Sequence, residues 1–267
     1  MLNHLVGSVN ALLPEPHASL LAGMLFGVRA TMPDDFYEAL IITGTLHVIA
    51  LSGMNVSIII RLLFGIMGKI FGKTTGLVLT ITGIVGFVFL VGPSATIIRA
   101  SIMGSLTLIA LWFGRKDIPL LSLVFTVLIM ILLNHDLISS ISFQLSVFAT
   151  LGIILFAGKE KFFVKNVWSG IWWFIKDNLR VTLSAQIFTT PLILFYFNRV
   201  SIISPFANVA IGWLIGPITY LGFMTVFLAQ IWWPLGRFAS LIVWVPLSFF
   251  IWIVKTFSQI PFASIEF

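Results

Sequence analysis

The segment GTLHVIALSGMN, residues 44–55, places three polar side chains, His47, Ser52 and Asn55, inside a long apolar stretch. Polar groups at membrane depth usually face a bundle interior or a water-filled cavity. On a helical wheel these three side chains fall, together with Gly44, within about half of the circumference. Two interpretations follow: the polar face bonds to neighbouring helices, or it lines a hydrated path.

Catalysis by Ser52 and His47 is disfavoured by their spacing. Intramembrane serine proteases carry the nucleophile in a Gly-x-Ser-Gly turn, and here Ala50 takes the place of the first glycine. A nucleophile needs its base within hydrogen-bond reach, but residues five apart on one helix point about 140° away from each other. The other histidines of the chain fall near the termini or in expected loops. We therefore expect no catalytic residues.

Further strongly polar side chains recur in other apolar segments. Single Ser and Thr residues satisfy themselves on their own helix, so only larger polar groups carry weight. Together with the opening segment, they form a candidate lining of a path through the membrane. The candidates are His47, Ser52, Asn55, Arg99, Gln144, Gln186 and Asn208.

Other kinds of membrane chemistry find no support in the sequence. No carboxylate is expected at membrane depth, which disfavours a proton-coupled carrier. No His or carboxylate pair has metal-ligand spacing, the chain has no cysteine, and no phosphate-binding loop is present. We expect neither a metal nor a cofactor. A conduit lined by cations and amides, without a buried acid, suits an anion.

The composition fixes the class of protein. The chain has 267 residues, of which 59% are hydrophobic and 9% charged, against about 25% charged in soluble domains. Apolar runs of about 20 residues recur along it, so we expect an all-α, polytopic membrane protein with about 7–9 crossing helices. The expected spans are residues 37–62, 75–91, 94–113, 118–134, 137–157, 180–197 and 238–256.

Three further segments are not expected to form a single membrane-crossing helix. Residues 17–29 are too short to cross and predict a re-entrant half-helix. Residues 167–180 contain three Trp and flanking bases and predict an amphipathic helix on the cytoplasmic surface. Residues 201–232 would be about 48 Å long as one helix, and the glycines and prolines inside them predict a break. Prolines and glycines also mark motifs elsewhere. The structural motif positions are Gly44, Gly53, Pro93, Pro191, Gly216 and Pro217.

Charge assigns the loops to the two sides of the membrane. Loops 61–74, 114–117 and 158–180 carry Lys and Arg, whereas the loops between them, 91–94 and 133–136, carry none. By the positive-inside rule the first three are cytoplasmic.

Four segments resemble, in order, the competence domain of the ComEC family of bacterial DNA-uptake channels. Residues 13–60 contain a Leu-Pro start, a leucine- and glycine-rich half-helix and a Thr-Gly-x-x-His-x-x-Ala-x-Ser-Gly signature. GPSATIIRASIM (92–103) is similar to the Arg-Ala helix of that family, and SFQLSVFATLGI (142–153) to its Phe-Gln-Leu-Ser segment. PLILFYFNRVSIISPFANVAIG (191–212) is similar to its Ser-Pro-x-x-Asn segment. The likeness covers about residues 12–220 of what we read as one transmembrane domain.

The resemblance implies a channel in the bacterial inner membrane that passes single-stranded DNA to the cytoplasm during natural transformation. Its implied partners are an extracytoplasmic DNA receptor and a cytoplasmic ATPase, and a pore within one chain or within a homodimer both fit. Gly44, His47, Ser52, Gly53, Arg99, Gln144 and Asn208 stand at family motif positions as lining or gating candidates.

Two departures limit what the resemblance implies. Met54-Asn55 replaces the usual Leu-His, and we find neither the oligonucleotide-fold domain nor the metallo-β-lactamase-like domain of larger relatives. A channel or carrier for a small anionic solute is the alternative function, ahead of the intramembrane protease.

Overall fold

The computed structural model describes residues 1–28, 32–49, 51–116, 118–158 and 166–266. Ala50, whose place in the serine motif the sequence analysis noted, lies outside these ranges. Within them the chain is almost entirely helical, and the one small sheet pairs β1 (Arg199–Ser201) with β2 (Ser264–Glu266) antiparallel. The helices are α1 Leu2–Leu12, α2 His17–Phe26, α3 Asp34–Ile42, η1 Leu46–Val48, α4 Gly53–Phe71, α5 Lys73–Val91, α6 Ala95–Trp112, α7 Pro119–Leu133, η2 His135–Ser139, α8 Ile141–Gly152, η3 Ile153–Ala157, α9 Val167–Phe197, α10 Ser204–Ile231 and α11 Trp233–Ser258.

The all-α, polytopic membrane class is confirmed. Among the described residues, six helical segments are long and apolar enough to cross a bilayer, and three shorter apolar helices accompany them. The six are the segment 46–71 that contains α4, together with α5, α6, α9, α10 and α11. Large apolar side chains such as Phe89 and Leu132 are more than four-fifths exposed, which suits contact with lipid tails.

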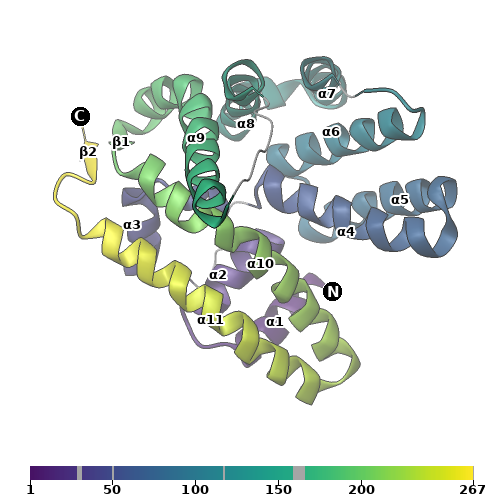
Figure 1. Cartoon of the computed structure of the whole chain (residues 1–267), viewed down its shortest axis with the longest axis horizontal. Coiled ribbons are helices and arrows are strands. Elements are labelled where there is room, and N and C mark those ends of the chain that lie inside the picture. Colours follow the sequence, from purple (N-terminus) through teal and green to yellow (C-terminus); the bar gives the residue numbers. More distant parts are fainter. Residues whose placement is uncertain (29–31, 50, 117, 159–165, 267) are drawn as a thin grey trace.

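The helices form three groups around a common centre (Figure 1). α4, α5 and α6 pack on one another, α10 and α11 form a long hairpin, and α7, α8 and α9 lie along the opposite edge. α1, α2 and α3 lie against the α10–α11 hairpin.

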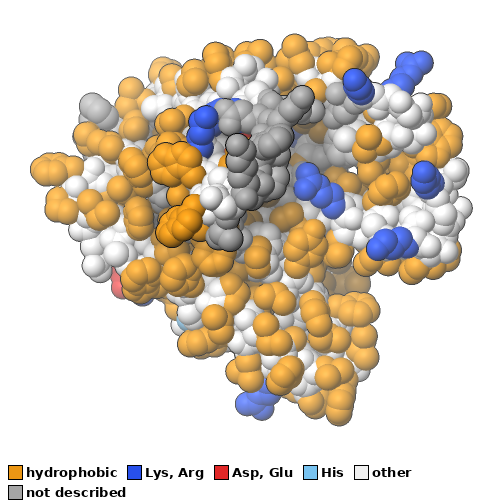
Figure 2. All heavy atoms as spheres, viewed as in Figure 1, with side chains coloured by type: hydrophobic (Ala, Val, Ile, Leu, Met, Phe, Trp, Pro, Cys, Tyr) orange, Lys and Arg blue, Asp and Glu red, His pale blue; other side chains and the backbone are white. Residues whose placement is uncertain are grey.

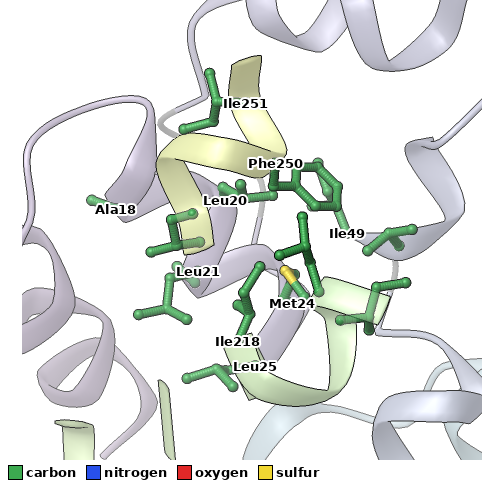
Figure 3. Packing of buried hydrophobic residues seen from close by; sticks show 14 of the residues in the cluster. Ala18, Leu20, Leu21, Met24, Leu25, Ile49, Ile218, Phe250 and Ile251 are labelled. Carbon is green, nitrogen blue, oxygen red and sulfur yellow. The ribbon is translucent and has the colours of Figure 1, made fainter. Parts of the chain in front are cut away.

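The main apolar core surrounds the half-helix α2. Every residue from Ala18 to Phe26 is buried, and Leu20, Met24 and Leu25 meet side chains of α10 and α11 (Figure 3). Gly27 ends the helix in a left-handed conformation (φ 72°), which glycine adopts without steric cost. The half-helix expected at 17–29 is therefore present as residues 17–26, inside the protein. Arg29 lies outside the described residues.

The helix expected over 37–62 is wrong. The chain leaves α3 at Thr43, turns through Gly44 (φ 66°), and passes through η1 and a turn at Leu51 (φ 42°) before α4 starts at Gly53. Only glycine suits this turn, because its φ is left-handed and a Cβ on Gly44 would lie 2.7 Å from Ser204 Cβ. The polar half-circumference of residues 43–55 consequently does not exist as one helix face.

The loop expected at 61–74 is also wrong, and for the same reason. Because α4 begins about sixteen residues later than expected, it extends to Phe71, and only Gly72 separates it from α5. Arg61 therefore lies in the middle of a candidate spanning helix. The loop expected at 114–117 is present over Gly114–Lys116, and Asp117 lies outside the described residues.

Two other predicted breaks are absent. The surface helix expected at 167–180 continues into residues 180–197 as the single helix α9, and α10 runs unbroken through Gly216 and Pro217. An internal proline removes one backbone hydrogen bond, and these long apolar helices retain the others. Pro191 likewise lies inside α9, whereas Pro93 lies in the short link between α5 and α6. Of the cytoplasmic loop expected at 158–180, residues 159–165 are outside the described ranges.

The Gly44 turn yields a first prediction. Gly44→Ala should lower the thermal unfolding temperature of the purified protein, because the left-handed backbone costs an L-residue about 1–2 kcal/mol and the new methyl overlaps Ser204. Gly86→Ala is the matched control, since that position is helical with nothing within 4 Å. Equal unfolding temperatures for Gly44→Ala and wild type would contradict the described turn.

Candidate functional site

Arg99 is a buried cation without a carboxylate partner in the described ranges. It lies on the second turn of α6 with 9% of its surface exposed. Nη1 donates to Thr150 Oγ1 on α8 and lies 3.9 Å from Met103 Sδ. Nε finds no hydrogen-bond partner among the described residues. A buried charge of this kind is costly unless it is paired or hydrated.

The start of α4 lies directly beside this guanidinium. A Cβ on Gly53 would be 2.8 Å from Arg99 Nη2, so a larger residue there would require the guanidinium to shift. The first N–H groups of a helix carry a partial positive charge. The guanidinium and the helix start therefore form one positive region, which suits an anion better than a second cation.

His47 and Ser52 lie on the segment between Gly44 and Gly53. His47 Nδ1 is hydrogen-bonded to the carbonyl oxygen of Gly44 (3.1 Å), and its ring is exposed. Ser52 caps α4, because its Oγ accepts the backbone N–H of Asn55 (3.4 Å). Within the described residues no histidine is hydrogen-bonded to Ser52.

Asn55 ties three helices together. Its side chain is fully buried, Nδ2 donates to the carbonyl oxygen of Met24 on α2 (2.9 Å), and Oδ1 accepts from Thr219 Oγ1 on α10 (3.4 Å). An amide satisfied on both sides in this way fixes the spacing of the helices.

Gln186 and Asn208 meet at Ser204. Both side-chain amides donate to Ser204 Oγ, at 3.0 and 3.2 Å. Because Gly44 packs against the same serine, this cluster holds the segment that carries His47. Gln144 bonds elsewhere: it donates to the carbonyl oxygen of Ile138 (2.9 Å) and accepts from Tyr196 Oη (3.0 Å).

The candidate residues thus do not meet at a single point. Gln186, Asn208 and His47 gather at one end of residues 44–53, and Arg99 lies at the other end. Asn55 and Gln144 each belong to a different helix contact.

The sequence analysis missed a basic groove on α4. An open groove of about 450 Å³ is lined by Arg61, Leu62, Gly65, Ile66, Lys69 and Ile70 of α4 and by Tyr220 of α10. The groove was missed because residues 61–74 were predicted to form a loop, in which no helix face is expected. The available signal was the spacing of Arg61, Gly65 and Lys69 at every fourth position, which places the three within about 80° on one side of a helix.

The described residues include no group of three or more His, Cys, Asp or Glu side chains that could hold a metal ion. The charged features of the site are cations, as at Arg99, Arg61 and Lys69.

The comparison with known families assigns the chain. The profile of the Competence protein family matches residues 24–267. The chain belongs to the Competence protein family. This Competence protein is 25% identical over 206 residues to ComE operon protein 3 of Bacillus subtilis (strain 168), covering 75% of the chain and 25% of that protein. It is also 31% identical over 133 residues to an uncharacterized protein of Aquifex aeolicus (strain VF5), covering 49% of the chain and 31% of that protein.

The matched regions of these curated relatives are thus about a quarter to a third of their length. No solved structure matches this Competence protein.

The Asn55 contacts yield a second prediction. Asn55→Leu should lower the free energy of unfolding by about 1–3 kcal/mol, because it removes a buried donor and a buried acceptor at once. Thr219→Val is the graded comparison and should cost less, since it leaves the bond from Asn55 to Met24 in place and removes the longer Asn55 contact together with the bond of Thr219 to the Ile215 carbonyl within its own helix. Thermal unfolding in detergent measures both. An Asn55→Leu variant as stable as wild type would show that this amide does not hold α4 to α2.

Proposed function

We propose that this Competence protein forms the membrane path through which single-stranded DNA enters a bacterial cell during natural transformation. Family membership and the likeness to ComE operon protein 3 support a role in competence. The apolar helices support a location in the cell membrane. The proposed partners are DNA, an extracytoplasmic DNA receptor and a cytoplasmic ATPase, with the loops rich in Lys and Arg on the cytoplasmic side.

Arg99 is the observation that carries the proposal. It is a cation held inside an apolar bundle, next to the positive end of α4, with one guanidinium nitrogen unpartnered within the described residues. A phosphate of a passing strand would provide the missing negative charge. Since the strand must also leave, a single cation at one point suits passage better than a closed cage of donors.

We propose that the remaining candidate residues line the path, control access to it or hold its helices together. His47 and Ser52 lie on the segment between Gly44 and Gly53, so a shift of this segment would change access to Arg99. Gln186 and Asn208 hold one end of the segment through Ser204. Gln144 ties α8 to α9. We propose these residues as lining or gate positions, and Asn55 as a tie beneath them.

Planar-bilayer recording tests the proposed function. Wild-type protein should conduct ions, and single-stranded oligo(dT) should block the current. Arg99→Gln should weaken the block on the order of tenfold, because hydrogen bonds to a charged group contribute about 1.5–3 kcal/mol. Arg99→Lys should keep more of the block than Arg99→Gln. Arg237→Gln, an exposed cation of α11, is the control and should behave as wild type.

Two outcomes would contradict this proposal. A current of small anions that oligo(dT) leaves unchanged would favour the channel for an anionic solute. A correctly folded protein that conducts nothing, and through which no DNA passes, would remove the conduit itself.

A further inference from the structure

One side of the second half of α4 carries two cations. Arg61, Gly65 and Lys69 recur at every fourth position and so fall within about 80° of the helix circumference. The side chains of Ser57, Arg61 and Lys69 are exposed. Arg61 and Lys69 are eight residues apart, or about 12 Å along the axis, and Arg61 is the same distance from Gly53, where Arg99 lies. Cations therefore occur at three levels of α4 about 12 Å apart along the axis, with Gly53 and Lys69 about 160° apart around it.

The packing of α5 fixes how deep Arg61 lies. α4 and α5 form a tight antiparallel pair: a Cβ on Gly76 would lie 2.5 Å from Gly68 Cα, and one on Gly83 would lie 3.3 Å from Leu63 Cδ1. Arg61, two residues before Leu63, is thus level with the middle of α5, which has no charged residue after Lys73. A cation at that depth costs about 2.5–3.5 kcal/mol if it faces lipid. The side of α4 that carries the two cations should instead border a hydrated space.

The groove between α4 and α10 supplies such a space. The two helices touch where Thr219 donates to Asn55, and α4 and α10 diverge from there toward their C-terminal ends (Figure 1). Figure 2 shows a notch between the lobe of α4, α5 and α6 and the lobe of α10 and α11, with Lys and Arg side chains on the upper lobe. Tyr220, next to Thr219, presents an aromatic ring to the groove from α10.

We propose that this groove is the second half of the path of the strand, in which Arg61 and Lys69 contact separate phosphate groups and Tyr220 stacks on a base. The inference rests on the proposed function and extends it beyond Arg99. Proteins that bind single strands without sequence preference combine a basic groove with aromatic stacking platforms. Gly65, between the two cations, leaves the groove floor open because nothing lies within 4 Å of its Cβ position.

Charge and depth favour a nucleic-acid strand over other occupants. The groove lining in the described part of the chain contains no Asp or Glu, so a second copy placing the same face here would meet like charge. A lipid phosphate sits at the membrane surface and can reach Lys69 near the end of α4. Arg61 lies about 15 Å from Phe71, which is too deep for a headgroup.

The salt dependence of oligo(dT) binding by the purified protein tests the proposal. For single strands the slope of log K against log salt changes by about 0.7 for each phosphate contact. Arg61→Gln and Lys69→Gln should each reduce the slope by about 0.7, and the double variant by about twice that. Tyr220→Ala should weaken binding about tenfold and leave the slope unchanged. Arg237→Gln, outside the groove, should leave both quantities unchanged.

The same variants identify what would overturn the proposal. Unchanged slopes in Arg61→Gln and Lys69→Gln, with loss of bound phosphatidylglycerol from nanodiscs, would make the groove a lipid site. Unchanged slopes with a shift in oligomeric state would make it an interface between copies. If Arg99→Gln alone weakens binding, the proposed function stands and this inference fails. If wild-type protein neither binds nor conducts oligo(dT), the proposed function itself fails.

Discussion

A cation inside an apolar bundle needs water, a dipole or an anion beside it, and this constraint shapes the centre of the protein. Arg99 and Arg61 both lie within helices that could cross a membrane, and in the described ranges neither pairs with a carboxylate. Removing such a charge from water without compensation costs several kcal/mol. Under the proposed function, hydrated space beside α4 would meet this need, and Gly65 leaves room for it next to Arg61 and Lys69.

The rest of the fold holds α4 in place around this space. Asn55 ties its first turn to α2 and α10, and the close approach of Gly68 and Gly76 fixes α5 against its other side. The half-helix α2 supplies a rigid apolar anchor beneath these contacts (Figure 3). Because α4 is fixed at its start and α10 diverges from it, the groove opens toward one end of the helix.

Hydropathy predicted most of the helices and little of the site. The helices α5, α6, α7, α8 and α11 lie within about five residues of the expected spans, but α7 and α8 are shorter apolar helices and not among the six candidate spans, fewer than the 7–9 expected. The start of α4 was misplaced because the turn depends on Gly44 meeting Ser204 from α10, a contact between residues 160 positions apart. Because the start of α4 was misplaced, the sequence analysis assigned Arg61 to a loop and did not predict the basic groove.

At the prolines, by contrast, the sequence analysis predicted breaks in helices that the structure shows to be continuous. Pro217 predicted a break in 201–232, yet tertiary packing on α2 and α11 keeps α10 whole. Among the candidate residues, Arg99 was the one whose isolation the sequence already indicated, since no acid was expected near it. The pairings of Gln144 with Tyr196 and of Gln186 with Ser204 join separate helices, so no periodicity could reveal them.

Water accessibility along α4 tests the central claim most directly. The chain has no cysteine, so single cysteines at Ser57, Gly65 and Lys69 can be probed with a charged thiol reagent in membranes, with Phe89→Cys on the exposed face of α5 as the control. The account predicts that the three α4 positions react, that the control does not, and that oligo(dT) slows the three reactions. Cysteines on α4 that react no faster than the one at Phe89, with or without DNA, would contradict it.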